Sequence, residues 1–84
     1  MLKAARLAVH YAVMDGKTYK LIELTGTSST SIEEAVQTAL AEAHKTVRNL
    51  RWFEVIDTRG TIDSSSGKVS EWQVTIKAGF RIEP

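Results

Sequence analysis

The chain has 84 residues, enough for one small domain, and its 43% hydrophobic content is too high for a disordered protein. A net charge of +1 argues against a dedicated nucleic-acid partner. The absence of cysteine excludes disulfide scaffolds, thiol catalysis and Cys-ligated metals. No apolar run approaches the roughly 20 residues of a membrane span, so no membrane partner is expected. We expect no metal site, because His10 and His44 lie far apart. A domain this small is often stabilised by oligomerisation.

Residues 1–17 differ from the remainder of the chain. Two basic residues precede a weakly apolar run that ends at Met14. This segment could be a signal peptide, an amphipathic helix that touches a membrane or partner, or an extension before a second start at Met14. We favour the extension, because the apolar run is short and Asp15-Gly16 is a turn signal. The chain is therefore divided into an extension, 1–17, disordered or added to the domain, and a domain, 18–84.

The domain is predicted to begin with a strand and then a helix. A strand is predicted over residues 18–26, in which Tyr19, Leu21, Ile22, Leu24 and Thr25 are apolar or strand-favouring, and Gly26 is expected to end it. Ser31 and Glu34 have the spacing of a capping box, in which the hydroxyl and the carboxylate each accept a free backbone N–H. Thr30 and Glu33 have the same spacing, so the helix start is predicted to within one residue.

The helix is the clearest element of the sequence. Its apolar positions recur at spacings of three and four, and polar residues mostly occupy the other side. Alanine is frequent among them, so a sheet is expected to pack closely against this helix. The apolar positions are Ile32, Ala35, Val36, Ala39, Leu40, Ala43, Val47 and Leu50.

Two further strands are predicted at 51–60 and 69–82, joined by a turn over 61–68. The last strand is the longest and alternates most clearly between apolar and polar residues, so we place it at the centre of the sheet. These elements predict an α+β fold of order β-α-β-β. Its three-stranded antiparallel sheet is partly wrapped around one helix.

Trp52 is the most informative residue. A single helix covers one face of the sheet, and the alternation that turns Phe53 and Val55 inward turns Trp52 outward. Gln73 also faces outward. An outward indole is covered either by a flat aromatic ligand, which the Gln73 amide could hydrogen-bond, or by a neighbouring subunit. Alternation alone favours the subunit interface.

Five segments of the domain follow the order and spacing of a known family. They are KLIELTGTS at 20–28, SIEEA at 31–35, NLRWFEV at 49–55, RGTI at 59–62 and WQVTIKAGFRIE at 72–83. Together they resemble dodecins, a family of small flavin-binding proteins. The resemblance extends from Tyr19 to Glu83, and it is the combination of segments that makes it specific.

The resemblance implies a hollow homododecamer that binds flavins in pairs near two-fold axes. It makes Trp52 the stacking residue and Gln73 the hydrogen-bond partner of the flavin edge. Arg59 matches the arginine that family members use at the phosphate of FMN, and Arg81 matches a polar residue near the site in some members. The implied cofactor is FMN or riboflavin, and coenzyme A is a second ligand in some dodecins.

The sequence departs from the family at a few positions. Arg51 precedes the tryptophan where dodecins often have an acidic or neutral residue, and Trp72 replaces the more usual Tyr or His. Arg59 has the wrong parity for the face of Trp52, unless a bulge or twist turns it.

Binding rather than turnover is expected. The sequence shows no nucleophile–base pair, carboxylate dyad or phosphate-cradling loop, and Gly26 and Gly60 are interpreted as turn or strand-end residues. The resemblance implies a cytoplasmic protein that stores and sequesters flavin, in which Trp52 quenches the photoexcited ring. The alternatives are a flavin-dependent redox enzyme and a structural oligomerisation module without ligand.

Overall fold

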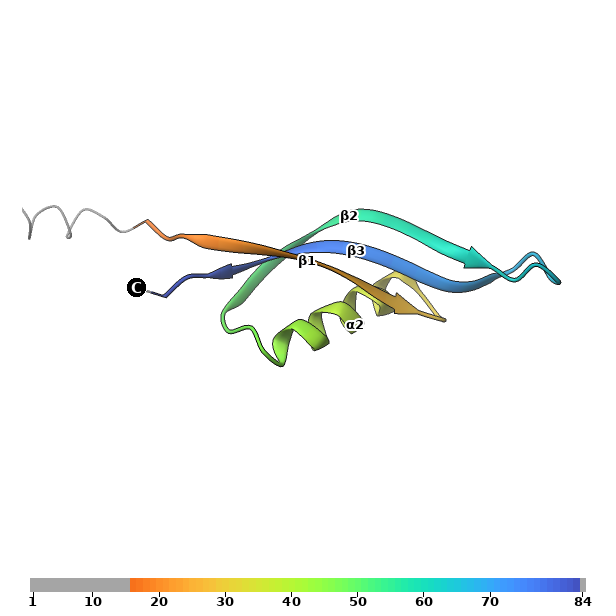
Figure 1. Cartoon of the computed structure of the whole chain (residues 1–84), viewed down its shortest axis with the longest axis horizontal. Helices are drawn as coiled ribbons and strands as arrows, with labels where there is room; N and C mark the ends of the chain where they lie inside the picture. Colours follow the sequence, from red (N-terminus) through yellow and green to blue (C-terminus); the bar gives the residue numbers. More distant parts are fainter. Residues whose placement is uncertain (1–15, 84) are drawn as a thin grey trace, which may run out of the picture.

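The computed structural model describes residues 16–83, which form one sheet with one helix against it (Figure 1). The elements are β1 (Tyr19–Ser28), α2 (Ile32–His44), β2 (Leu50–Ile62) and β3 (Val69–Arg81). The strands are antiparallel in the order β1-β3-β2. The predicted class, the β-α-β-β order and the central last strand are confirmed, with strand ends within two residues of those expected. Most of the predicted N-terminal extension, residues 1–15, lies outside the described residues.

The start of α2 agrees with the capping signal. Ser31 is the N-cap, and its Oγ accepts the backbone N–H of Glu34 at 3.0 Å. The backbone N–H of Ser31, which a full capping box would pair with the Glu34 carboxylate, donates instead to Oγ of Ser28 at 3.4 Å. The preceding strand therefore contributes to the cap, and it ties the end of β1 to the beginning of α2.

The end of α2 differs from the prediction. The helix stops at His44, although the apolar spacing continues to Leu50. Asn49 has a φ of 66°, a left-handed conformation that a right-handed helix does not contain. Leu50 is already in β2, where it pairs with Phe80. Pairing with a distant strand thus determines the conformation of a residue whose local spacing indicated helix.

The core lies between α2 and the two strands beneath it. Its buried residues are Ala35, Val36, Ala39, Ala43, Val74, Ile76 and Ala78. The alanine side of the helix does pack on the sheet, and Gly26 permits the close approach. A Cβ at Gly26 would overlap the backbone oxygen of Ala35 and lie 2.9 Å from Cβ of Ala39. Gly26 is therefore an interior position of β1 and not its end, and Gly60 is likewise inside β2.

Strand β2 is largely uncovered by its own chain. None of its residues is buried, because α2 packs on β1 and β3, while the β2–β3 hairpin extends past the helix (Figure 1). Phe53 and Val55 pair with the buried Ala78 and Ile76, so they face inward as predicted. They nevertheless stay 45% and 47% exposed. A long edge strand that exposes several large apolar side chains is unusual for a chain that stays alone.

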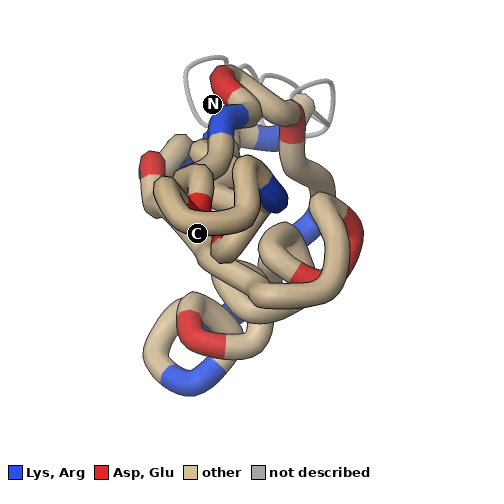
Figure 2. Tube along the Cα trace, turned by 90° about the vertical axis from the view of Figure 1, so that its right-hand side faces the viewer, with Lys and Arg blue, Asp and Glu red and all other residues tan. Residues whose placement is uncertain are grey.

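Charged residues of both signs occur throughout the described part of the chain. Lysine and arginine are interspersed with aspartate and glutamate along the trace (Figure 2). The ion pair between Lys45 and Glu42, at 3.2 Å, is exposed to solvent and contributes little to stability. Within residues 16–83, no helix has the length and hydropathy that crossing a bilayer requires.

Candidate ligand-binding face

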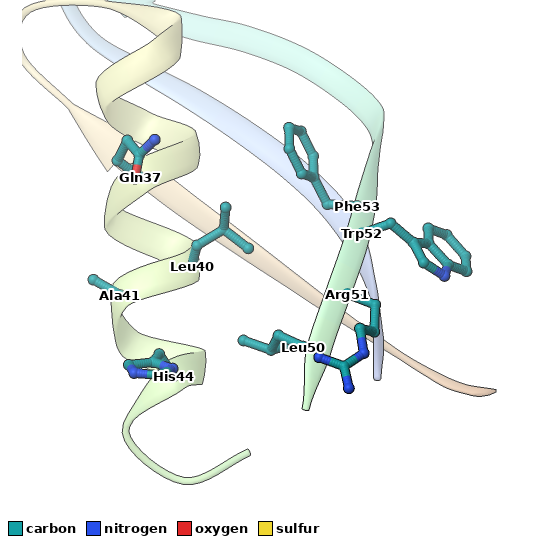
Figure 3. A pocket seen from close by; sticks show the side chains of 8 residues that line it. All are labelled: Gln37, Leu40, Ala41, His44, Leu50, Arg51, Trp52 and Phe53. Atoms are coloured by element: carbon teal, nitrogen blue, oxygen red, sulfur yellow. The ribbon is translucent and has the colours of Figure 1, made fainter. Parts of the chain in front are cut away.

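The sheet face opposite α2, the outer face, carries Trp52. This residue lies directly opposite Gly79 of β3, and its indole covers that glycine. A Cβ on Gly79 would lie 2.5 Å from Cε2 of the indole. Figure 3 shows the indole pointing away from α2, whereas Phe53 points toward the helix. The predicted outward orientation of Trp52 is therefore confirmed, and the indole remains 43% exposed.

Two further apolar side chains flank the indole from β1. Leu21 pairs with Gly79 from the opposite side of β3 and is exposed. The Tyr19 ring approaches Trp52 across β3, with 6.5 Å between ring centroids and 58° between planes. The missing side chain at Gly79 lets these groups meet above the central strand. Tyr19, Leu21 and Gly79 carry no local sequence signal for this site, since they are brought together only by the register of the three strands.

A β-bulge brings Arg59 to the outer face. The register of β2 against β3 shifts by one residue between Val55 and Asp57, which leaves Ile56 without a partner. One extra residue reverses the alternation beyond it, so Arg59 faces the same side as Trp52. Simple alternation along β2 would place Arg59 on the face opposite to Trp52, and the bulge reverses that placement.

Arg59 and Gln73 are in direct contact. They are cross-strand partners, and Nε of Arg59 donates to Oε1 of Gln73 at 3.0 Å. Nε2 of Gln73 in turn donates to Oε1 of Glu71 at 3.2 Å. The Gln73 amide therefore lies between a cation and an anion, and both of its polar atoms are engaged.

Trp52 and Gln73 share a face but are not neighbours. Trp52 lies opposite Gly79, and Gly79 is six residues from Gln73 along β3. At a rise of ~3.4 Å per residue this is about 20 Å. A three-ring heterocycle centred on the indole does not extend that far. The expectation that Gln73 could hydrogen-bond a flat ligand covering Trp52 is therefore wrong within one chain.

Arg81 lies at the Trp52 end of the outer face, opposite Tyr19. Its backbone N–H donates to the oxygen of Asn49 at 3.0 Å. Its side-chain Nε is buried and has no hydrogen-bond partner among the residues that the structure describes. The four predicted site residues thus fall into two groups, Trp52 with Arg81 and Arg59 with Gln73.

A groove of about 380 Å³ lies behind Trp52, between α2 and the start of β2 (Figure 3). Its lining is mostly apolar and consists of Gln37, Leu40, Ala41, His44, Leu50, Arg51, Trp52 and Phe53. The groove exists because α2 packs on β1 and β3 and leaves β2 uncovered. It is one more apolar surface that a single chain does not fill.

These observations define a small α+β domain with a helix on one sheet face and an uncovered indole on the other. The family model for Dodecin matches residues 18–83, and the chain belongs to the dodecin family. The dodecin of Thermus thermophilus is 53% identical over 68 residues, 81% of this chain and 96% of that protein. The calcium dodecin of Mycobacterium tuberculosis is 33% identical over 66 residues, 79% of this chain and 90% of that protein.

Solved structures agree with this assignment. A crystal structure from Thermus thermophilus superposes with a TM-score of 0.76 at 52% identity, covering 82% of this chain and 98% of that one. Streptomyces coelicolor dodecin gives a TM-score of 0.76 at 44% identity, covering 84% and 99%. The family resemblance and the fold that it implied are thus confirmed.

Proposed function

We propose that this dodecin is a cytoplasmic flavin store that binds FMN or riboflavin through residues 18–84, with the isoalloxazine ring stacked on Trp52. The observation that carries the proposal is the exposed indole held over Gly79 on the open face of the sheet. A flat heterocycle covers such a surface well, and each aromatic stack contributes about 0.5–1.5 kcal/mol beyond the burial of area. An indole in contact with a photoexcited flavin can donate an electron to it and quench its emission.

The store is proposed to be a hollow homododecamer. The exposed inner-face residues of β2 and the groove beside α2 support assembly, because further copies would cover apolar surface that one chain leaves open. Small domains without disulfides commonly gain stability in this way.

The flavin site is proposed to need more than one copy. Trp52 and Gln73 of one chain are about 20 Å apart by strand rise, so a ring stacked on Trp52 would take its hydrogen bonds from Gln73 of a neighbouring copy. An amide of this kind contributes about 1 kcal/mol net. Arg59, beside Gln73, would favour FMN over riboflavin through a charge-assisted bond to the phosphate.

Other ligands have weaker support. The Mycobacterium tuberculosis relative is named a calcium dodecin, but among residues 16–83 no group of three or more His, Asp or Glu side chains could hold a metal ion. We therefore do not extend calcium binding to this chain. Coenzyme A stays a prediction of the family resemblance with no residue assigned to it. Arg81, whose Nε has no hydrogen-bond partner within residues 16–83, is proposed as an additional polar contact at the Trp52 end.

Titration of FMN into the ligand-free protein, combined with its mass in solution, tests the proposal. We expect strong quenching of flavin emission and a mass of twelve chains. Trp52→Ala should weaken FMN binding about tenfold or more without changing the mass. Trp72→Phe is the matched control, because it alters a tryptophan of β3 that pairs with Gly60 at the other end of the sheet.

The outcomes separate the candidate functions. Unquenched emission at saturation would contradict stacking, and unchanged affinity of Trp52→Ala would remove that residue from the site. Turnover of NADH by the bound flavin would favour a redox enzyme. A colourless protein that ignores added flavin would favour a purely structural module.

A further inference from the structure

The Gln73 amide is placed between two opposite charges on the outer face. Its Oε1 accepts from Nε of Arg59 at 3.0 Å, and its Nε2 donates to Oε1 of Glu71 at 3.2 Å. Rotating the amide by half a turn would put its oxygen against the carboxylate and its NH₂ group against the guanidinium. Both contacts would then be repulsive, because Arg has only donors and an ionised Glu has only acceptors. The two neighbours therefore allow one amide orientation.

The same contacts leave two polar sites of the Gln73 amide free for a ligand. A carboxamide has two acceptor sites on oxygen and two donor hydrogens on nitrogen, so one of each is left over here. A cation at the oxygen and an anion at the NH₂ group polarise the amide in the same direction. This polarisation reinforces both contacts, so the amide keeps its orientation and holds the free acceptor and the free donor in place.

We propose that Glu71 is a positioning residue that, with Arg59, presents the Gln73 amide in one orientation to a ligand with an imide edge. Such an edge carries a carbonyl next to an N–H, and it matches one free acceptor and one free donor. The inference rests on the proposed flavin function, since the pyrimidine part of isoalloxazine has this edge.

The arrangement gives Arg59 two separate tasks. Its Nε orients Gln73, whereas its two terminal nitrogens make no hydrogen bond within residues 16–83. Those terminal nitrogens stay available to a phosphate while Nε is engaged. Glu71 is half-buried and reaches Arg59 only through the amide, so its effect on a ligand passes through Gln73.

Binding of riboflavin and of 3-methylriboflavin to the assembled protein tests the role of Glu71. The methylated compound lacks the N3–H donor, and neither compound carries a phosphate. We expect the natural protein to prefer riboflavin, and Glu71→Gln to reduce that preference about three- to tenfold, because a neutral carboxamide at position 71 no longer opposes the reversed amide and only Arg59 still selects the orientation of Gln73. Glu23→Gln, on the same face beside Lys77, removes the same charge and should keep the preference. An unchanged preference in Glu71→Gln overturns the proposal, as does equal affinity of the natural protein for the two flavins.

A ligand-free measurement separates this inference from flavin binding itself. The side-chain ¹⁵N–¹H resonances of Gln73, assigned through their loss in Gln73→Glu, should shift in Glu71→Gln and stay in place in Glu23→Gln. If neither flavin binds the natural protein, the proposed function fails, and a shift of this kind still supports the positioning role. Resonances that Glu71→Gln leaves unchanged overturn the positioning role even where flavin binds.

Discussion

Trp52 occupies the space above Gly79 that any side chain at position 79 would need. The two residues are opposite each other on β2 and β3, and a Cβ on the glycine would lie 2.5 Å from Cε2 and 2.6 Å from Cζ2 of the indole. The indole of Trp52 can therefore take this position only because residue 79 of the central strand has no side chain.

Gly79→Ala is expected to displace the indole and weaken FMN binding about tenfold. The added methyl group cannot be accommodated without movement, and overpacking of this kind costs about 1–3 kcal/mol. Fluorescence titration with FMN measures the effect. Gly16→Ala is the control, since no atom of the described part of the chain lies within 4 Å of a Cβ at that position. Natural affinity and natural quenching in Gly79→Ala would show that the contact does not orient Trp52 for binding.

Arg59→Ala is expected to narrow the difference in affinity between FMN and riboflavin about tenfold or more. A charge-assisted bond to the phosphate is lost, and such bonds contribute about 1.5–3 kcal/mol. Because Nε of Arg59 also contacts Gln73, riboflavin binding should fall as well, though less than FMN binding. Parallel titrations with both flavins measure the ratio, with the exposed Arg48→Ala as control. A constant ratio would refute the phosphate contact.

Gly26→Ala is expected to lower the free energy of unfolding by about 1–3 kcal/mol or more. Its methyl group would overlap the backbone oxygen of Ala35, and backbone in a packed helix moves less readily than the end of a side chain. Denaturant unfolding measures the loss, and Gly16→Ala again serves as the neutral substitution. Equal unfolding midpoints for the two variants would mean that α2 is not packed as tightly on β1 as the structure indicates.

Asp63 lies at the tip of the β2–β3 hairpin, and it is expected to make the stability of the protein depend on pH. Its carboxylate accepts the Ser65 hydroxyl at 2.7 Å and the Ser65 backbone N–H at 2.9 Å, and these bonds hold the pKa of Asp63 below its usual 3.8. A depressed pKa in the folded state contributes stability that is present above the usual pKa and is lost as pH falls toward the folded value. Asp63→Asn should therefore lower Tm at neutral pH, and the difference should shrink below pH about 3.8.

Thermal unfolding across that range measures the dependence. Ser65→Ala removes only the hydroxyl contact and should reproduce part of the effect. A difference between Asp63→Asn and the natural protein that stays constant with pH would contradict the role of the charged carboxylate.

Local sequence patterns were sufficient to predict the elements, their order and the outward direction of Trp52. The hydroxyl of Ser31 caps the helix, alanines at helical spacing form its packed side, and alternation in the last strand identifies the centre of the sheet. These features depend on residues within a few positions of one another, so local patterns are sufficient to predict them. The family resemblance added the candidate roles of Trp52, Gln73, Arg59 and Arg81.

The side that Arg59 faces and the distance between Trp52 and Gln73 could not be predicted in this way, because both depend on how β2 pairs with β3. The bulge at Ile56 and the pairing of Trp52 with Gly79 are properties of the β2–β3 register. The early end of α2 and the interior place of Gly26 likewise follow from contacts with strands far away in the chain. Such contacts join residues that are distant in sequence, and local periodicity carries no information about them.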